Sequence, residues 1–254
     1  MSRRLEHKVA VVTGGGAGLG RAVSERFALE GGTVVIAEVD EKRGREAVER
    51  IERDHGDALF VKTDVAEEAD VMALAEEVGK RYGRVDVMYN NAGILFHDKD
   101  AKAHELSTEI WDRTMRVNLR GLWLCTKYLI PLMLEKGGAI IHVGSPTALN
   151  GCGAGLTAYC ASKGGIHGLT KVMAIDYAPN QIRVNCIIPG VMDTPMNKSV
   201  LTDETATAKL MARIPLGRVG EGVDLAGLAT FLASDESLYC TGGLYMADGG
   251  LMAF

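Results

Sequence analysis

Short apolar runs rich in β-branched residues recur along this chain of 254 residues, and a helical pattern follows most of them. Runs of this kind are typical of strands buried on both faces of a parallel sheet. Because strands and helices alternate throughout, we expect an α/β fold built on one doubly wound parallel sheet. The expected strands are residues 9–12, 33–37, 58–63, 85–89, 139–143, 182–188 and 243–246, and the expected helices are 21–30, 41–54, 67–82, 108–135, 158–177, 203–214 and 222–233.

A glycine-rich turn separates the first expected strand from the first expected helix. It covers residues 13–20, and Gly14, Gly18 and Gly20 set its G-x-x-x-G-x-G spacing, with Leu19 between the last two. A turn in this position points backbone N–H groups and the positive end of a helix dipole at a phosphate. The spacing is not the G-x-G-x-x-G of the common dinucleotide motif. Phosphate binding is therefore predicted from the position of the turn, and a tight turn without a ligand is the alternative.

An acidic residue, Glu38, ends the second expected strand, about 20 residues beyond the glycine turn. A carboxylate in this position can accept hydrogen bonds from a ribose 2′-hydroxyl. It would repel a 2′-phosphate by roughly 4 kcal/mol at about 4 Å and an effective dielectric constant of about 20. No Arg or Lys stands at Gly15, Gly16 or Val39 to offset this repulsion. The pattern predicts NAD in preference to NADP; alternatively, Glu38 caps the helix at 41–54.

Two later strand ends carry further candidate ligand contacts. Asp64 and Val65 follow the third expected strand, where Asp64 caps the next helix or this neighbourhood touches an adenine ring. The fourth expected strand leads to Asn91, Ala92 and Gly93. Small residues there let the backbone approach a ligand, and a plain turn is the alternative.

Tyr159 and Lys163 stand four residues apart at the start of the helix expected at 158–177. This spacing places both side chains on one face of a helix. A phenol in water titrates at about 10, and a neighbouring ammonium favours its phenolate form. The pair can therefore act as one acid/base unit, in which Lys163 pulls the pKa of Tyr159 toward neutral pH. Ser145 follows the fifth expected strand and can present its hydroxyl to the same place; a surface helix pair is the alternative reading of the Tyr–Lys spacing.

Asn118 is a polar residue between Val117 and Leu119 in the helix expected at 108–135. An amide inside an apolar stretch needs hydrogen-bond partners. Asn118 is therefore either a structural bracket or part of a proton path.

Composition excludes several classes of protein. The net charge is −5, the sequence pI is near 5.7 and no basic block is present, so nucleic acid is not an expected partner. Five scattered cysteines and six isolated histidines match no disulfide framework and no metal-ligand spacing. No apolar segment approaches the roughly 18 residues of a membrane span. We therefore expect a cytoplasmic protein with no metal and no membrane segment.

The segment 192–215 follows a strand end and is rich in Met, Thr, Asp and Leu, so we expect it to form a lid over a substrate. Apolar and small residues near the candidate site favour an uncharged substrate such as a cyclic or aromatic alcohol; they are Leu95, Leu149, Cys152, Gly153, Leu156, Met192 and Met196. A sugar or polyol is the alternative, since His97, Asp98 and Asn150 can face the same cavity.

Together these residues resemble the short-chain dehydrogenase/reductase family in its single-domain branch. The likeness spans residues 9–250 and is carried by Thr13, Gly14, Gly18, Gly20, Asn90, Asn91, Ala92, Gly93, Asn118, Ser145, Tyr159, Lys163, Pro189, Gly190 and Thr194. It implies a Rossmann-like doubly wound sheet of seven parallel strands, flanked by helices on both faces, in a single domain 1–254. The dinucleotide-binding half would then cover about residues 1–150 and the catalytic and substrate-binding half about 138–254.

The resemblance also implies roles for the site residues. Tyr159 would be the general acid/base, Lys163 would bind the nicotinamide ribose, Ser145 would hold the substrate oxygen, and Asn118 would anchor a water of the proton relay. Further cofactor contacts would come from Gly14, Gly18, Leu19, Gly20, Glu38, Asp64, Val65, Asn91, Ala92, Gly93, Pro189, Gly190, Val191 and Thr194. Members of the family are commonly tetramers, so we expect a homotetramer packed partly through the helices of Asn118 and Tyr159.

One departure from the family pattern concerns the serine. Ser145 stands one residue farther from Tyr159 than is usual in the family, and Pro146 occupies the usual place. One extra residue in the glycine-rich loop 151–156 restores the match, so Ser145 is the predicted hydroxyl and Thr147 the second choice.

The expected function is reversible hydride transfer between NAD and a secondary alcohol or its ketone. A nucleotide-sugar epimerase or dehydratase is one alternative, although such relatives usually have G-x-x-G-x-x-G spacing and a longer substrate domain. An NAD-binding sensor without catalysis is another, opposed by the complete Asn–Ser–Tyr–Lys set. A serine hydrolase is excluded because the chain around Ser145 lacks the G-x-S-x-G turn.

Overall fold

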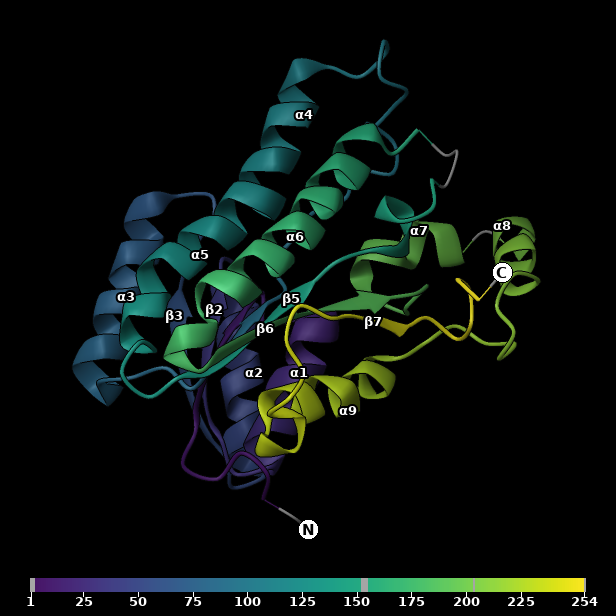
Figure 1. Ribbon diagram of the computed structural model, residues 1–254. Coiled ribbons are helices and arrows are strands. Elements are labelled where there is room, and N and C mark those ends of the chain that lie inside the picture. The colour runs from purple at the N-terminus through teal and green to yellow at the C-terminus, as the bar shows by residue number, and fades with distance from the viewer. Residues whose placement is uncertain (1–2, 152–154, 203, 254) are drawn as a thin grey trace.

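The computed structural model describes residues 3–151, 155–202 and 204–253 (Figure 1). Its seven described strands form one parallel sheet in the order β3-β2-β1-β4-β5-β6-β7. The strands are β1 (Val9–Thr13), β2 (Thr33–Glu38), β3 (Asp57–Lys62), β4 (Val87–Asn90), β5 (Gly138–Val143), β6 (Ile182–Pro189) and β7 (Leu244–Ala247). The expected doubly wound α/β fold is confirmed, and the ends of the expected strands shift by two residues at most.

Helices cover both faces of this sheet (Figure 1). On one face lie α1 (Gly18–Leu29), α2 (Glu41–Arg53) and α9 (Gly222–Ala233), and on the other lie α3 (Glu68–Tyr82), α5 (Leu122–Leu129) and α6 (Thr157–Asp176). Each fully buried Leu, Ile, Val or Phe on these faces contributes about 1.5–3 kcal/mol of transfer free energy. Among the described residues, no helix is both long and apolar enough to cross a membrane.

The order of the strands reverses at the centre of the sheet. β1 pairs with β2 on one side and with β4 on the other, and Thr13 lies beside Asn90 at the end of the second pair. In open sheets of this kind, ligands bind in the crevice at the carboxyl ends of the strands where the order reverses. The topology therefore places the ligand site at the ends of β1 and β4.

The helix expected at residues 108–135 is interrupted. It divides into α4 (Thr108–Met115), a π-helical turn (Arg116–Gly121), α5 and a short 3₁₀ turn (Ile130–Leu132). Gly121 packs on Val65, and a Cβ at position 121 would lie 2.8 Å from Val65 Cγ2. Pro131 has no N–H to continue an α-helix, so the regular helix ends at α5, before the expected end.

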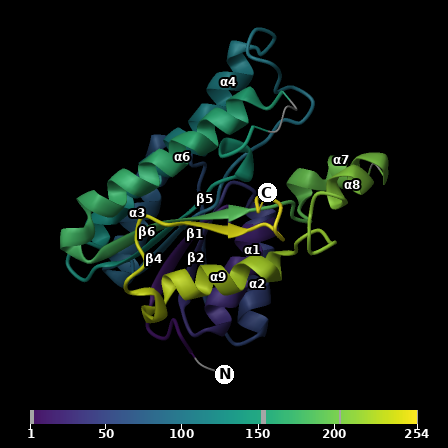
Figure 2. The same ribbon diagram turned by 45° about the vertical axis from the view of Figure 1, so that its right-hand side comes forward.

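Two further element boundaries differ from expectation. α1 begins inside the glycine turn, at Gly18 instead of residue 21. The lid segment holds two short helices where one was expected, α7 (Lys198–Leu201) and α8 (Glu204–Met211), after a 3₁₀ turn (Pro195–Asn197). Figure 2 shows α7 and α8 projecting beside the sheet, with the C-terminal end of the chain next to them.

Candidate active site

A cavity of about 1160 Å³ opens at the carboxyl ends of the strands. It extends from the glycine turn to the lid. Most of the predicted site residues line it: Gly14, Gly18, Leu19, Glu38, Asp64, Val65, Asn91, Ala92, Gly93, Ser145, Tyr159, Lys163, Pro189, Gly190, Val191 and Thr194. Two predicted residues, Gly20 and Asn118, do not line it.

The glycine turn forms the start of α1. Gly14 and Gly18 have positive φ angles of 63° and 52°, which other residues adopt rarely. Gly20 has a packing role instead of the predicted ligand contact, since a Cβ there would lie 2.1 Å from the Gly14 carbonyl oxygen. None of the described side chains caps α1 at Ala17. Its first N–H groups therefore form a positive end that can accept a phosphate.

A hydrogen-bonded brace fixes the glycine turn to the end of β4. The Thr13 hydroxyl accepts hydrogen bonds from the N–H groups of Asn91 and Ala92 at 3.0 and 3.1 Å. Asn91 Nδ2 donates to the carbonyl oxygens of Thr13 and Gly14 at 3.1 and 3.2 Å. The segment from Asn91 thus holds the turn in shape and lines the cavity at the same time.

Glu38 lies buried at the end of β2, with its carboxylate held by backbone N–H groups. Oε2 accepts from Gly16 at 3.2 Å, and Oε1 accepts from Val39 and Asp40 at 3.0 and 3.2 Å. The alternative that Glu38 caps α2 is wrong, because Asp40 is the N-cap and accepts from the Arg43 N–H at 3.1 Å. Glu38 therefore lies at the cavity wall.

Sequence reasoning missed a cation beside Glu38. Arg43 lines the cavity from the first turn of α2, and its guanidinium pairs with Asp40 at 3.3 Å. The uncharged positions Gly15, Gly16 and Val39 lie in or next to the turn and Glu38 in sequence. Arg43 reaches the cavity because α2 packs beside the turn.

Asp64 and Val65 both line the cavity after β3. The Asp64 carboxylate accepts from the Ala66 N–H at 2.9 Å, which closes a turn ahead of α3. The N-cap of α3 is Glu67, so Asp64 does not cap that helix directly. Their place at the cavity agrees with the ligand-contact interpretation.

Ser145, Tyr159 and Lys163 come together at the centre of the cavity. The Ser145 side chain lies close enough to Tyr159 to lower the pKa of the phenol. Lys163 Nζ lies 5.7 Å from the Tyr159 ring centroid and donates to the Val143 carbonyl oxygen at 2.8 Å. Thr147, the second-choice hydroxyl, also lines the cavity and lies 2.9 Å from Ser145 Oγ. The predicted triad of hydroxyl, phenol and ammonium is thus present.

The pKa values of the pair differ from expectation. Burial raises the pKa of Tyr159 to about 12, and the nearby Ser145 side chain offsets only part of this rise. Burial also lowers the pKa of Lys163 to about 8. The expectation that Lys163 draws the pKa of Tyr159 toward neutral is wrong for the chain by itself, because burial penalises the phenolate and the ammonium is directed at Val143.

Asn118 lies fully buried in the π-helical turn, behind the cavity wall. Its Oδ1 accepts from the Ile94 N–H at 2.8 Å, and its Nδ2 donates to the Ile94 carbonyl oxygen at 2.9 Å and to Ser162 Oγ at 3.1 Å. The side chain is thus a bracket that fixes Ile94, which lines the cavity. Its part in a proton path stays a prediction.

The end of β6 supplies the wall opposite α1. Gly190 approaches the chain after β7 so closely that a Cβ would lie 2.6 Å from the Asp248 Cα. Thr194 packs against Gly18, where an added Cβ would lie 3.6 Å from Thr194 Cβ. Pro189, Gly190, Val191 and Thr194 all line the cavity.

The predicted substrate residues separate into two groups. Leu95, His97, Asn150, Leu156, Met192 and Met196 line the cavity, whereas Leu149 and Asp98 do not. Cys152 and Gly153 lie outside the described residues. Sequence reasoning missed Arg213 of the lid and Leu251 and Met252 after β7, which also line the cavity.

A buried imidazole next to Lys163 was also not predicted. His142 on β5 is fully buried, and burial together with the Lys163 charge lowers its pKa to about 3, so it is neutral. Thr170 Oγ1 donates to the Ile166 carbonyl oxygen and lies 3.0 Å from His142 Nδ1. His142 Nδ1 therefore carries the proton that Thr170 accepts, a tautomer inferred from these two contacts. No group of three His, Cys, Asp or Glu residues able to hold a metal occurs in the described part of the chain.

Comparison with known proteins gives close matches over the whole chain. A sequence profile described as enoyl-(acyl carrier protein) reductase matches residues 14–252. The oxidoreductase YxbG of Bacillus subtilis (strain 168), itself uncharacterized, is 44% identical, over 99% of this chain and 93% of that protein. The 3-oxoacyl-[acyl-carrier-protein] reductase FabG of Thermotoga maritima is 38% identical, over 98% of this chain and 99% of its own.

A solved structure agrees with the sequence matches. It is a protein proposed to be an NAD(P)-dependent gluconate 5-dehydrogenase, from Beutenbergia cavernae, with NADP bound at low occupancy. The two chains share 34% identity, cover each other completely and superpose with a TM-score of 0.93.

Proposed function

Because this chain belongs to the short-chain dehydrogenase/reductase family, a family of oxidoreductases that bind a nicotinamide cofactor, we propose that it interconverts a secondary alcohol and a ketone with NAD. The observation that carries the proposal is the meeting of Ser145, Tyr159 and Lys163 in the cavity that the glycine turn also lines. A sensor protein would need the glycine turn but not this catalytic group.

The residues around the cavity fit a dinucleotide. The uncapped start of α1 suits a pyrophosphate, the Glu38 carboxylate suits a ribose hydroxyl, and the Lys163 ammonium suits a second ribose. Oxidised nicotinamide, when bound, supplies the hydride acceptor. The protein's contribution is to bind this group, to orient the alcohol and to handle its proton.

The proposed proton transfer runs through the phenol. Ser145 donates a hydrogen bond to the substrate oxygen, and Tyr159 accepts the hydroxyl proton as the carbon–hydrogen bond gives up its hydride. In the reverse direction, Tyr159 returns the proton to the ketone oxygen. The positive charge of oxidised nicotinamide, added to that of Lys163, would favour the phenolate that this step requires, whereas Lys163 by itself does not offset the effect of burial.

The preference for NAD rests on the buried Glu38 carboxylate, which would repel a 2′-phosphate. Arg43 lies at the same part of the cavity and could partly offset that repulsion, although its guanidinium pairs with Asp40. Glu38→Gln removes the negative charge at little change in shape. We expect the ratio of kcat/KM for NADP to that for NAD to rise at least about tenfold.

Glu46→Gln is a suitable control for this test, because Glu46 is an exposed carboxylate on the same helix as Arg43 and only approaches Lys42 at 4.0 Å. It should leave the ratio unchanged. A parent chain that uses NADP better than NAD would reject the NAD preference.

The substrate end of the cavity supports an uncharged substrate. Leu95, Leu156, Met192 and Met196 give it an apolar lining. His97 and Asn150 provide polar contacts that a sugar or polyol would use. The proposed substrate is therefore a cyclic or aromatic secondary alcohol, with a polyol as the second candidate.

A panel of secondary alcohols tests the proposal. Alicyclic alcohols, hydroxysteroids, aryl carbinols, sugars and gluconate are each incubated with NAD and with NADP, and the formation of reduced nicotinamide is followed by absorbance. Turnover of an alicyclic or aryl alcohol with NAD is the expected result. Binding of NAD without turnover of any alcohol would favour the sensor, and a preference for gluconate would reject the uncharged substrate.

A further inference from the structure

The helix that carries Tyr159 starts without a capping residue of its own. Leu156 stands at the N-cap of α6, its side chain makes no capping hydrogen bond, and the first turn has no acidic residue. The first N–H groups of a helix have no partner inside the helix and need one elsewhere. The partner must therefore come from another part of the chain.

Asp100, 59 residues before Tyr159, supplies this partner. Its Oδ1 accepts a hydrogen bond from the Ala158 N–H at 3.1 Å, and its Oδ2 accepts one from the Tyr159 N–H at 2.9 Å. Among the described residues no cation pairs with this carboxylate. The positive end of the helix dipole stabilises a carboxylate in this position. Both oxygens of Asp100 are thus bonded to the turn that presents Tyr159.

A second contact reinforces the same junction. Thr157 Oγ1 donates to the Ala101 carbonyl oxygen at 2.6 Å. Gly155 has a φ angle of 69° and packs close to Ala101. A Cβ added at Gly155 would lie 3.4 Å from backbone atoms of Ala101. The start of α6 is therefore attached to residues 100–101 through side chain and backbone.

Asp100 belongs to a segment that borders the cavity. At one end of this segment, Ile94 is fixed by the two hydrogen bonds of Asn118. In its middle, His97 Nε2 lies 3.1 Å from the Met196 carbonyl oxygen, at the start of the lid. Residues 94–101 thus connect the lid and the π-helical turn to the helix of Tyr159.

We propose that Asp100 is a positioning residue, which holds the first turn of α6 and so keeps the Tyr159 hydroxyl against Ser145. Tyr159 is the third residue of the helix, so fraying of the first turn would displace its side chain. A displacement of about 1 Å in an active site can cost roughly 100-fold in rate. The effect on turnover rests on the proposed function, whereas the effect on the helix does not.

Three variants test the proposal. Asp100→Ala removes both hydrogen bonds, and Asp100→Asn keeps the shape but can accept only one of them. Asp98→Asn is the matched control, because Asp98 is an exposed carboxylate two residues away in the same segment, with no partner among the described residues. The isosteric Asn variant keeps the test available if the Ala variant does not fold.

Amide hydrogen exchange is the first measurement, and it needs no substrate. We expect the Ala158 and Tyr159 amides to exchange at least about tenfold faster in Asp100→Ala than in the parent chain, with a smaller change in Asp100→Asn. Asp98→Asn should match the parent. Unchanged exchange in both Asp100 variants would overturn the proposal.

Turnover of the alcohol that the parent chain oxidises fastest is the second measurement. We expect kcat to fall about 10- to 100-fold in Asp100→Ala, while the dissociation constant for NADH stays within about twofold. Faster exchange with unchanged kcat would reject the positioning role and leave only a structural cap. A parent chain without turnover would reject the proposed function and any role of Asp100 in it, whereas the exchange result would still decide whether Asp100 holds the helix.

Discussion

Burial acts in opposite directions on the two groups at the centre of the cavity. It raises the pKa of Tyr159 to about 12 and lowers that of Lys163 to about 8, a shift toward the neutral form in each case. One pKa unit corresponds to about 1.4 kcal/mol, so a phenolate in the chain by itself is costly near neutral pH. A cationic group next to the phenol, such as oxidised nicotinamide, would reduce this cost. The acid/base step of the proposed reaction would therefore depend on the bound cofactor.

Tyr159→Phe tests the acid/base role. The phenyl ring keeps the shape of the site but has no proton to exchange, so we expect kcat to fall about 100-fold or more, with NADH affinity nearly unchanged. Steady-state kinetics and NADH titration measure the two effects. Tyr177→Phe, at the far end of α6, should behave like the parent. Near-full activity of Tyr159→Phe would contradict the assignment.

Spacing and position in the chain predicted most of the residues that form the site. Tyr159 and Lys163 are one helical turn apart, and Ser145 and Glu38 end or follow strands, so all four reach the same edge of the sheet. The direction of the pKa shift of Tyr159 was not predictable, since it depends on burial and not on spacing. Arg43 was missed because it approaches Glu38 only through the packing of α2.

The π-helical turn between α4 and α5 packs closely against Val65, behind the cavity. Gly121 ends this turn, and a Cβ there would lie 2.8 Å from Val65 Cγ2 and 3.0 Å from the Val65 carbonyl oxygen. Val65 lines the cavity on its other side. The packing of one glycine thus fixes part of the predicted cofactor wall.

Gly121→Ala should therefore affect both stability and binding. The added methyl group overpacks the contact with Val65, and we expect a loss of about 1–3 kcal/mol in the free energy of unfolding and a higher dissociation constant for NADH. Chemical denaturation and NADH titration provide the measurements. Gly227→Ala in α9 is the control, because an added Cβ there meets nothing within 4 Å, and it should stabilise the chain by up to about 1 kcal/mol. Equal behaviour of the two variants would contradict this account.

Element positions were largely predictable from apolar runs, but element interruptions were not. Residues 108–135 have a helical pattern throughout, whereas the π-helical turn that interrupts it contacts Val65 and Ile94, which are distant in sequence. The same holds for Asp100, which caps α6 from 58–59 residues away, with no local signal in the sequence of the helix.

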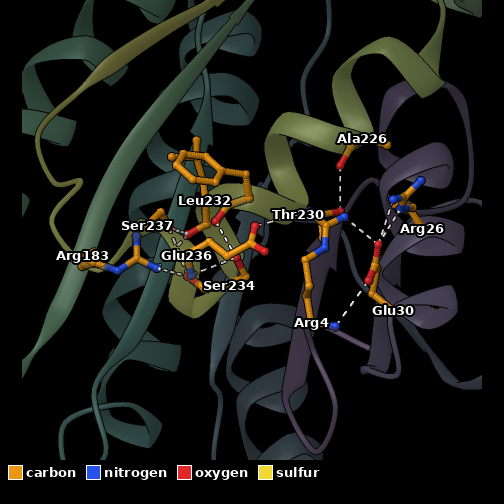
Figure 3. Close-up of polar contacts among 11 residues, drawn as sticks. Arg4, Arg26, Glu30, Arg183, Ala226, Thr230, Leu232, Ser234, Glu236 and Ser237 are labelled. Carbon is orange, nitrogen blue, oxygen red and sulfur yellow. Dashed lines mark hydrogen bonds and ion pairs between the residues drawn. The ribbon is translucent and has the colours of Figure 1, made fainter. Parts of the chain in front are cut away.

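At the scale of the whole molecule, an ion-pair network lies among the N-terminal segment, α1 and the residues after α9 (Figure 3). The Glu30 side chain is only 7% exposed and pairs with Arg4 at 2.6 Å and with Arg26 at 2.8 Å. Arg4 also approaches Glu236 at 3.5 Å. These contacts join the first residues of the chain to both α1 and the end of α9.

The network predicts a specific pH dependence of stability. Hydrogen bonds from Arg4 first, and also from Arg26, lower the pKa of Glu30 from 4.5 to about 2. A depressed carboxyl pKa contributes stability that is present above pH 4.5 and is lost as the pH falls toward 2. We expect Glu30→Gln to lose about 3 kcal/mol near pH 7 and to show a flatter decline in unfolding free energy between these pH values.

Glu25→Gln is the control for the Glu30 variant. Glu25 lies on the same helix, but it is partly exposed and only approaches Arg21 at 3.6 Å, so its loss should change the free energy by less than about 1 kcal/mol. Denaturation curves at several pH values compare the three proteins. An identical pH profile for Glu30→Gln and the parent would refute the assigned role.

Exposed apolar residues on α4, α5 and α6 support a proposed homotetramer. Trp111, Trp123, Val172 and Ile175 are between 37% and 75% exposed. We expect a solution mass about four times 27.2 kDa in light scattering and a smaller mass for Ile175→Glu. Leu29→Glu, on α1 at the other face of the sheet, should keep the parent mass. A monomeric parent at micromolar concentration would reject the proposal.

The doubly wound parallel sheet followed from the alternation of strand and helix patterns, which leaves few topologies for such a sheet. The tertiary contacts of the last residues did not follow. Leu251 and Met252 line the cavity because Gly249 and Gly250, with φ angles of 63° and 89°, turn the chain back toward the lid. A strand pattern predicts where β7 ends but not where the following residues go.

This return of the chain has a practical consequence for protein production. The Leu216 N–H donates to the Gly249 carbonyl oxygen at 3.1 Å, so the residue that follows the lid is bonded to the chain after β7. An affinity tag fused on the C-terminal side would begin beside the cavity that Leu251 and Met252 line. The opposite end of the chain lies away from α7 and α8 (Figure 2), and a purification handle placed there leaves this cavity clear.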